Sequence, residues 1–486
     1  MYVDSFLYTD VSPEYNAFNG VPEKNGPKIY EILLDNYEFI TSYTNRRIFR
    51  ASVFDDVQMA LLCHTSFLGH VEYECPRCHK RMYITASCHS PLCSSCGVKE
   101  SRYRAAKVGS MVVDAPHRHI VFTIARELTD YFIRYRSLLD LLFIAARNAL
   151  ADVANDRKYR KMKRRQTRNA KNKNIVKPSR KKKRKTPYDY KDDEDRMQIG
   201  AIMTLHTFGR DLKWNPHIHA LVCEQIYDRK NDKVKDFKYI SYDKIRRVWQ
   251  YQVLKLLSES DELRNDAKFR RLRNSLYSKY DSGFYVHAPR KKGADEDTDV
   301  DQCVKYITRY TSRPAMADSR LLEYDDKKKT VRYWYERHED GERVEAFEYV
   351  YLFLFKLLRH CPSPNFKMVR YYGYYSNRGK KMLDHIYELN EQLVKRHKRR
   401  IRLRSKKHRK KKLQKDKNSL RYRTLMIESF SRDPLICSCG ELMDRVAVFD
   451  PFKGEAINDR QYRHRCIYAC IRDDRFARRS DDSGGP

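Results

Sequence analysis

The feature that most constrains this chain is a cluster of five cysteines within 22 residues. The whole chain has 486 residues and 13 cysteines, so an even distribution would place fewer than one cysteine in such a window. The spacing Cys75-x2-Cys78-x14-Cys93-x2-Cys96 lets two tight turns each present two thiolates to one tetrahedral ion. In a reducing compartment such spacing indicates zinc rather than disulfides. We therefore expect Cys75, Cys78, Cys93 and Cys96 to bind one Zn2+.

The fifth cysteine of the cluster, Cys88, leaves three alternatives open. It could replace one of the four expected ligands, join a second site with Cys63, His64 or His70, or remain a buried thiol. The spacing alone does not choose between these roles. A zinc module would show only that this unit folds around a metal, and not what it contacts.

A second group of cysteines lies near the C-terminus, as Cys437-x-Cys439 and Cys466-x3-Cys470. One intervening residue is fewer than in an ordinary zinc knuckle, so the spacing is less typical of a metal site. We expect either a second Zn2+ site formed by these four cysteines or a set of buried thiols.

The net charge of +36 comes almost entirely from two blocks of the chain. Residues 157–185 contain 17 Lys or Arg and no acid, and residues 395–417 contain 15 with a single acid. The blocks could be solvated segments, but a polyanionic partner explains them better, because each neutralised phosphate releases counterions. Neither block has the apolar face of an interfacial membrane helix. We expect salt-sensitive, sequence-independent nucleic-acid binding and no membrane contact.

Hydrophobic periodicity divides the chain into segments of different character. The central segment alternates strand-like and helix-like runs, which predicts a mixed α+β core around an antiparallel sheet flanked by helices. The expected segments are a helical region 1–65, a zinc-binding module 66–105, a core 112–380 with a basic insertion 157–187, a basic helical segment 381–425 and a cysteine-containing tail 426–486. The expected core elements are strands at 119–124, 199–207, 217–223 and 283–287, helices at 127–154, 242–257 and 300–310, and a hairpin at 321–336.

A candidate catalytic motif is His217-Ile218-His219. Residues two apart on a strand point to the same face, so both imidazoles can bind one divalent ion while Ile218 packs into the core behind them. A rival pair exists in His117-Arg-His119, but its middle residue would place a charge on the face that should be buried. The first pair therefore fits a Lewis-acid site better.

A nucleophile for such a site is offered by Tyr306 and Tyr310. The two tyrosines are four residues apart on an expected helix, so their hydroxyls lie on one face. A tyrosine that attacks a phosphodiester forms a covalent intermediate, which conserves the bond energy for religation. The chain has 36 tyrosines, so the same spacing also arises from ordinary packing.

Taken in order, these motifs resemble the two-tyrosine HUH transposases of rolling-circle insertion sequences, which carry an N-terminal zinc-binding domain. The similarity spans about 310 residues. The motifs that carry it are Cys75-Pro-Arg-Cys78, Ser87-Cys-His-Ser-Pro-Leu-Cys-Ser-Ser-Cys96, His119-Ile-Val-Phe-Thr-Ile124, Leu205-His-Thr-Phe-Gly209, Asn215-Pro-His-Ile-His219, Tyr306-Ile-Thr-Arg-Tyr-Thr-Ser-Arg-Pro314 and Val369-Arg-Tyr-Tyr-Gly373.

The resemblance implies a bacterial, cytoplasmic DNA-nicking enzyme with an HUH nuclease core. His217 and His219 would bind Mg2+ or Mn2+, and Tyr306 and Tyr310 would form 5′-phosphotyrosine links with single-stranded or hairpin DNA at the ends of a mobile element. His206 would be either a third metal ligand or a packed core histidine. The zinc module would help to recognise the ends of the element.

Two other functions remain open at this point. A rolling-circle replication initiator or a conjugative relaxase would use the same chemistry, although a zinc module ahead of the HUH strand favours a transposase. Alternatively, the chain is a non-catalytic, zinc-dependent nucleic-acid-binding protein whose histidines and tyrosines are structural. Convergence of the histidines and the tyrosines in the folded chain would distinguish the enzyme from the binding protein.

Overall fold

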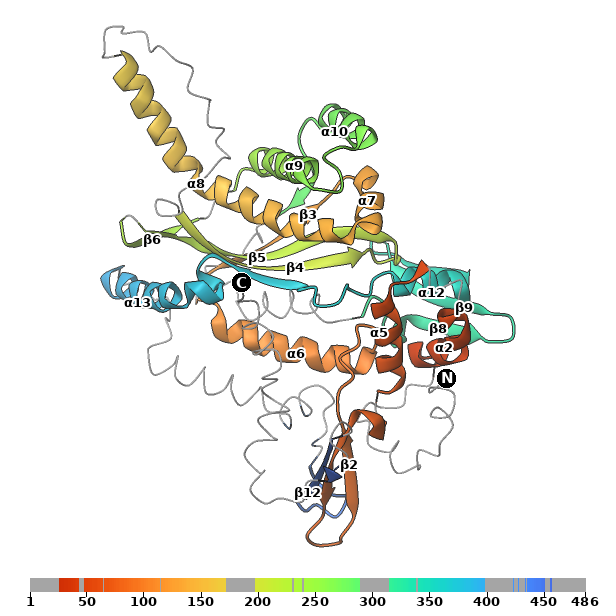
Figure 1. Cartoon of the computed structure of the whole chain (residues 1–486). Coiled ribbons are helices and arrows are strands. Elements are labelled where there is room, and N and C mark those ends of the chain that lie inside the picture. Colours follow the sequence, from red (N-terminus) through yellow and green to blue (C-terminus); the bar gives the residue numbers. More distant parts are fainter. Residues whose placement is uncertain are drawn as a thin grey trace.

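The computed structural model describes residues 26–42, 48–63, 65–113, 115–171, 197–229, 231–237, 240–288, 314–337 and 340–397, with short stretches between 423 and 456. The expected helix 300–310, with Tyr306 and Tyr310, lies outside these residues, as do Cys466 and Cys470. The described part is built around an antiparallel sheet with helices on both faces (Figure 1). This confirms the expected mixed α+β class. None of the described helices combines the length and the apolarity needed to span a bilayer.

The central sheet has the strand order β11-β4-β5-β3-β7, with β6 paired to β5, and every pairing is antiparallel. Its strands are β3 (His117–Thr123), β4 (Met197–Phe208), β5 (Trp214–Asp228), β6 (Lys233–Asp236), β7 (Val286–His287) and β11 (Val369–Tyr372). β5 begins earlier than expected and includes Pro216. This proline, which has no N–H, lies where the β4–β5 register shifts between His206 and Phe208, so it breaks no regular ladder bond.

One face of the sheet is covered by a layer of helices, above it in Figure 1. These are α7 (Thr129–Arg134), α8 (Leu139–Lys171), α9 (Tyr242–Glu259) and α10 (Ala267–Lys279). Phe122 of β3, Leu205 of β4 and Ile218 of β5 point into this layer and are fully buried with Trp249 of α9. The removal of these side chains from water is the main term that holds the helices on the sheet.

The helix expected at 127–154 is interrupted in the structure. It is divided into η2 (Arg126–Leu128), α7, η3 (Arg136–Leu138) and α8. The interruption lies at Tyr135, whose φ of −123° and ψ of 88° are not helical, and it allows Phe132 and Leu138 both to be buried. α8 then continues to Lys171, so the backbone is helical well into the first basic block, where we expected an insertion loop.

The sequence interpretation missed α10. The Asp266 side chain caps this helix by accepting hydrogen bonds from the backbone N–H groups of Lys268 and Phe269. Only Phe269 and Leu276 of the helix are buried, so its apolar periodicity is weak. The capping residue Asp266 was therefore a stronger sequence signal for this helix than its hydrophobic periodicity.

The opposite face of the sheet is covered at one end by α6 (Ser94–Met111) and α13 (Lys380–His397). Here Tyr374 and Tyr375 of η5 (Gly373–Tyr375) are buried against β4, followed by η6 (Asn377–Gly379). A Cβ at Gly200 would lie 2.2 Å from the Tyr374 ring, so β4 needs a glycine where the tyrosines cross it. The middle of this face carries histidines.

A second, three-stranded antiparallel sheet stands beside the central sheet, at the right of Figure 1. Its strands are β8 (Leu321–Asp325), β9 (Thr330–Glu336) and β10 (Arg343–Tyr349), and β8 and β9 form the expected hairpin. Residues of this sheet share one hydrophobic cluster with helices that come before and after its strands in the sequence. These are α2 (Ile29–Asp35), α3 (Tyr37–Thr41), α5 (Ala51–Leu61) and α12 (Val350–Leu358), with η4 (Asp318–Arg320) between the core and β8.

A small sheet projects from the rest of the molecule, at the bottom of Figure 1. Its strands, in the order β13-β12-β1-β2, are β13 (Glu455–Ala456), β12 (Asp444–Asp450), β1 (His70–Glu74) and β2 (Arg81–Thr85), and η1 (Ser66–Leu68) precedes β1. β12 pairs with β1 from His70↔Phe449 to Glu74↔Asp444. The segments 66–105 and 426–486, expected to be separate, therefore share one sheet.

Candidate functional site

The middle of the sheet face opposite α7–α10 holds a cluster of three histidines, His206, His217 and His219. His206 of β4 lies directly opposite His217 of β5, and His219 follows two residues later on the same face. Their ligand nitrogens all lie within 4.8 Å of one another. Ile218 points to the other face and is fully buried, as the strand alternation predicted. Three imidazoles from two adjacent strands therefore converge on one point.

The hydrogen bonds of the cluster orient the imidazoles. His217 Nδ1 lies 2.6 Å from the carbonyl oxygen of Asn215, which can only accept, so Nδ1 carries the proton and Nε2 has a free lone pair. This Nε2 faces Nε2 of His219 at 3.0 Å. The other ring nitrogen of His219, Nδ1, lies 2.8 Å from Nε2 of His119.

Burial keeps these imidazoles neutral at physiological pH. Loss of hydration lowers the pKa of His217, and it lowers the pKa of His219 well below the ordinary value, with neighbouring histidines adding to the effect. Burial also lowers the pKa of His119 to about 4. Neutral imidazole is the form that binds metal ions, so no proton has to be displaced at pH 7.

His119 was not expected in this cluster, because we rejected the pair His117-Arg-His119 on account of its central charge. Arg118 does point to the buried face, but its Nε donates to Glu224 at 2.7 Å, so the charge is neutralised. The two histidines have different partners: His117 contacts the Tyr375 hydroxyl at 2.7 Å, whereas His119 meets His219 edge to edge with nearly parallel rings. The signal for His119 lay in the pairing of β3 with β5, which the sequence does not specify.

The tyrosines Tyr306 and Tyr310 lie outside the described residues, so their distance from the histidines remains a prediction. The described chain before them ends in β7, which pairs with β3 through Val121↔His287 on the histidine face. The chain is described again at 314, and Met316 is buried in the same cluster as Leu212 of the turn before β5. The described residues that flank the tyrosines are thus β7, paired with β3 on the histidine face, and Met316, in the cluster that contains Leu212.

A first group of four cysteines lies between the central sheet and the small sheet. Its members are Cys63, Cys88, Cys93 and Cys96, and their sulfurs are 3.5–3.6 Å apart in the contacts that join them. Four thiolates held at about 2.3 Å around a tetrahedral ion would be about 3.8 Å apart, so the spacing fits zinc. Hydrogen bonding with the neighbouring thiols, Cys88 above all, raises the pKa of Cys63. Hydrogen bonding with Cys63 above all lowers the pKa of Cys96.

A second group contains Cys75, Cys78, Cys437 and Cys439, with sulfurs 3.5 Å apart across the two pairs. Each pair sits on a tight turn that needs an unusual backbone conformation, with φ of 58° at His79 and 88° at Gly440. Hydrogen bonding from the Cys439 backbone lowers the pKa of Cys437 to about 6, which favours the thiolate.

The expected zinc ligand sets are therefore corrected. Cys75 and Cys78 do not share a cluster with Cys93 and Cys96, because the β1–β2 hairpin carries the first pair away from the start of α6. Of the alternatives for Cys88, a site with Cys63 is the one that the geometry favours. Cys437 and Cys439 join Cys75 and Cys78, while Cys466 and Cys470 lie outside the described residues.

Comparison with known proteins identifies two family domains along the chain. Residues 36–124 match a family described as "Transposase zinc-binding domain", and residues 200–382 match one described as "Putative transposase". The first match contains the whole of the first cysteine group and one half of the second. The second match contains the three histidines, Tyr306 and Tyr310.

Two curated proteins are similar over about two thirds of the chain. One is named "Transposase for insertion sequence element IS801", from Pseudomonas savastanoi pv. phaseolicola, and is 28% identical over 67% of this chain and 70% of its own length. The other is named "Putative transposase y4qJ", from Sinorhizobium fredii, and is 22% identical over 65% of this chain and 73% of its own length. No solved structure matches the chain significantly.

Proposed function

Because the chain belongs to the IS91-type insertion-sequence transposases with an N-terminal zinc-binding domain, we propose that it nicks and transfers single-stranded DNA through a 5′-phosphotyrosine intermediate. The observation that carries the proposal is the convergence of three histidines on β4 and β5, of which His217 and His219 have pKa values lowered by loss of hydration. A packed core does not need three imidazoles whose ligand nitrogens point at one another, whereas a metal-dependent nuclease does.

The histidine cluster fits a divalent ion in two respects. Two nitrogens bound at right angles to an ion, each about 2.1 Å from it, are about 3.0 Å apart, and this is the separation of Nε2 of His217 and Nε2 of His219. The buried hydroxyl of Thr204, directly opposite His219, has no hydrogen-bond partner in the described part of the chain. It supplies a further oxygen at the site for an ion or its bound water.

We propose Mn2+ or Mg2+ as the ion, held by His217 and His219 with His206 as the third ligand. Imidazole nitrogen suits transition metals better than it suits Mg2+, which prefers oxygen ligands, so Mn2+ should support the reaction better. When bound, the ion polarises the scissile phosphate and stabilises the charge that develops on it. His217, through its hydrogen bond to Asn215, and His219, through its contact with His119, keep their Nε2 atoms aimed at this position.

In the proposed reaction, the phenol oxygen of Tyr306 or Tyr310 attacks the phosphorus of a DNA phosphodiester. A P–O bond to the tyrosine forms and the P–O3′ bond breaks, so the 5′-phosphate stays on the enzyme. The phenolic proton goes, through solvent, to the departing 3′ oxygen, so the released strand leaves with a 3′-OH. Attack of a 3′-OH on the phosphotyrosine reverses the step and joins the new strand, and two tyrosines would allow donor and target to be cut in turn.

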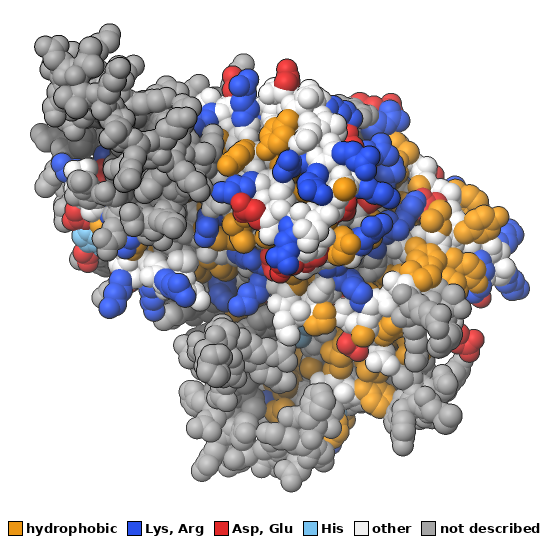
Figure 2. All heavy atoms as spheres, turned by 45° about the horizontal axis from the view of Figure 1, so that its top comes forward, with side chains coloured by type: hydrophobic (Ala, Val, Ile, Leu, Met, Phe, Trp, Pro, Cys, Tyr) orange, Lys and Arg blue, Asp and Glu red, His pale blue; other side chains and the backbone are white. Residues whose placement is uncertain are grey.

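The helices that cover the far side of the sheet present a basic surface suited to the DNA backbone. Lys and Arg side chains gather over α9 and α10 in Figure 2. α10 carries no acidic residue at all. The exposed cations are Arg247, Lys268, Arg270, Arg271 and Lys279. Contacts of this kind position nucleic acid without reading its sequence.

We further propose that each cysteine group holds one Zn2+. The first site lies within the zinc-binding domain, while the second joins the β1–β2 hairpin to the turn before β12, more than 350 residues later in the chain. Because the ligands come from distant segments, an ion bound there would hold these segments together, and the free energy of metal binding would stabilise the fold.

The nicking proposal is tested by incubating the full chain with Mn2+ and single-stranded oligonucleotides that tile both ends of the DNA element encoding it. We expect a covalent protein–DNA adduct that survives denaturation. The double variant Tyr306→Phe, Tyr310→Phe and the variant His219→Ala should both abolish it, the first by removing the nucleophiles and the second by removing a metal ligand. His385→Ala, which changes an exposed histidine of α13, is the matched control and should form adduct normally.

Two results would contradict the proposal. One is an adduct that persists in the double tyrosine variant. The other is an adduct that forms equally well in His219→Ala and in the native protein at limiting Mn2+.

A further inference from the structure

At the edge of the histidine face, the guanidinium of Arg246 lies between two exposed tyrosine rings. Its carbon Cζ is 5.2 Å from the ring centre of Tyr285 and 5.5 Å from that of Tyr242, within the range of cation–π attraction. Tyr285 is 55% exposed and Tyr242 is 38% exposed. The two tyrosines come from different elements, Tyr242 from the start of α9 and Tyr285 from the residue before β7.

Arg246 carries a charge that no acid neutralises in the described part of the chain. Its Nε is buried and lacks a hydrogen-bond partner among the described residues. Glu127, the residue after Arg126 of the pocket lining, already accepts hydrogen bonds from Lys279 and from Tyr280. An unpaired cation flanked by exposed aromatic rings suits a planar, electron-rich or anionic ligand.

The position of this site relates it to the histidines. The hydrogen bond from Thr123 N to the Tyr285 carbonyl continues the β3–β7 register by one residue, and Thr123 lies opposite His217 on β5. Tyr285, Thr123 and His217 therefore form one row across three strands, on one face of the sheet. Two strand spacings separate Tyr285 from His217, about 10 Å.

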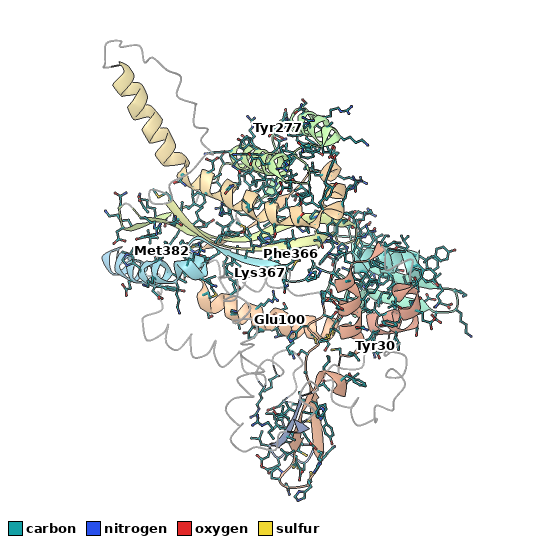
Figure 3. The ribbon with its side chains drawn as sticks, viewed as in Figure 1. Tyr30, Glu100, Tyr277, Phe366, Lys367 and Met382 are labelled. Carbon is teal, nitrogen blue, oxygen red and sulfur yellow. The ribbon has the colours of Figure 1, made fainter. Side chains whose placement is uncertain are left out.

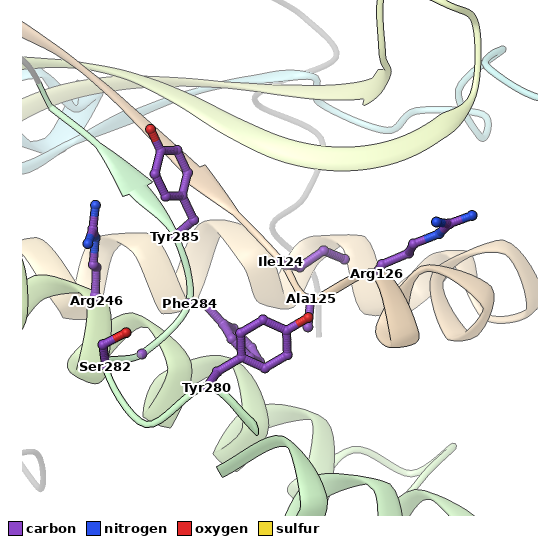
Figure 4. Close-up of a pocket in the computed structure, with 9 residues that line it drawn as sticks. Ile124, Ala125, Arg126, Arg246, Tyr280, Ser282, Phe284 and Tyr285 are labelled. Atoms are coloured by element: carbon purple, nitrogen blue, oxygen red, sulfur yellow. The ribbon is translucent and has the colours of Figure 1, made fainter. Parts of the chain in front are cut away.

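The backbone around Tyr285 is shaped to hold it there. Gly283 has φ of +89°, and a Cβ at this position would lie 2.3 Å from the backbone of Arg246. The loop is thus pressed directly onto α9, which brings Tyr285 beside Arg246. Figure 4 shows both side chains extending in the same direction from the rim of a pocket whose floor includes Tyr280 and Phe284.

From these observations we propose that Tyr285, Arg246 and Tyr242 form a stacking site for an unpaired DNA base next to the phosphate that is cut. The inference rests on the proposed function and identifies the strand as single, because a base inside a duplex cannot offer its face to these side chains. The guanidinium and the rings bind the base by stacking, while the histidine cluster receives a phosphate of the same strand.

The test is the binding of fluorescent single-stranded and duplex oligonucleotides of the same sequence to the full-length Tyr306→Phe, Tyr310→Phe protein, without added Mg2+ or Mn2+. Fluorescence anisotropy gives the dissociation constants. In this background Tyr285→Ala should weaken single-strand binding about five-fold or more, since one stacked base contributes at least that factor. Tyr285→Phe, which keeps the ring, should bind within about two-fold of the parent.

Tyr30→Ala is the matched control, because Tyr30 is 42% exposed and lies on α2, in a different part of the molecule from α9 and α10 (Figure 3). It should leave both dissociation constants unchanged. The proposal is overturned if Tyr285→Ala binds single strands like Tyr30→Ala, or if single-strand and duplex binding weaken equally, which would indicate a phosphate contact. Since no cleavage occurs in this assay, a failure of adduct formation in the native protein would refute the nicking mechanism and leave this result standing.

Discussion

At the scale of single residues, the histidine site depends on His119, which is not itself one of the proposed metal ligands. If His219 binds the ion through Nε2, its Nδ1 must carry the proton and donate it to Nε2 of His119, 2.8 Å away. His119 is then a positioning residue, which fixes the tautomer and the ring plane of His219. The nearly parallel, edge-to-edge placement of the two rings supports this arrangement.

We predict that His119→Ala raises the Mn2+ concentration needed for half-maximal adduct formation about 10-fold or more, as loss of a metal ligand's hydrogen-bond partner commonly does. The rate at saturating Mn2+ should change little, because the reacting groups remain. His119→Gln retains an acceptor and should recover part of the affinity. A loss of saturated rate with an unchanged Mn2+ requirement would exclude the positioning role.

A second histidine prediction concerns stability. His360 is buried between Thr207 and Leu212, and burial lowers its pKa to about 3. Between the unfolded value of about 6.5 and this folded value, the unfolded chain binds a proton that the folded chain does not, so stability is lost as the pH falls. The loss from His360 alone is about 2 kcal/mol at pH 5.

Urea denaturation of the native protein and of His360→Gln at pH 7 and pH 5 measures this term. The variant starts less stable but should lose about 2 kcal/mol less between the two pH values, because it has no imidazole to protonate. Loss of zinc at low pH affects both proteins equally. Equal losses would show that His360 is not held neutral by the fold.

At the scale of the elements, strand alternation predicted the histidine pair and its buried partner Ile218 correctly. Alternation specifies only which residues share a face, however, and not which strands are neighbours. For this reason His119 was missed on β3, which pairs with β5 from about a hundred residues away. The same limit explains the wrong grouping of the cysteines: Cys75 and Cys78 form their cluster with residues brought in by β12.

We predict that the native chain binds two Zn2+ and that Cys437→Ser with Cys439→Ser binds one. Metal analysis of the purified proteins gives the ratio. Hydrogen exchange should become faster in β1 and β2, because the hairpin loses its tie to β12, and should stay unchanged in α6. Cys223→Ala, which removes a buried thiol outside both groups, is the control and should retain two ions. Two ions in the Cys437, Cys439 variant would contradict the joined site.

At the scale of the whole molecule, the chain combines a sheet face that bears three clustered histidines, a projecting sheet that carries a group of four cysteines, and long basic segments. Composition predicted the partner, since the two basic blocks hold most of the net charge. It did not predict their structure, because α8 extends to Lys171 as a continuation of a core helix. Local charge repulsion was outweighed there by the propagation of a helix already nucleated in the core.

We predict that deleting residues 157–187 weakens binding to all single-stranded sequences alike and reduces the dependence of binding on salt. Each phosphate contact that is lost lowers the slope of log K against log salt by about 0.7 for a single strand. Binding titrations at several salt concentrations, with at least three unrelated oligonucleotides, measure both effects. A loss confined to one sequence would mean that this segment reads bases.

The central claim is that the histidine cluster and the tyrosines of the following connection act on the same phosphate. Its most direct test is protease digestion of the Mn2+-dependent protein–DNA adduct, followed by mass spectrometry of the peptide that carries the nucleotide. The account predicts a 5′-phosphate attached to Tyr306 or Tyr310. A nucleotide on any other residue, or no adduct with any strand from the ends of the element, would contradict it.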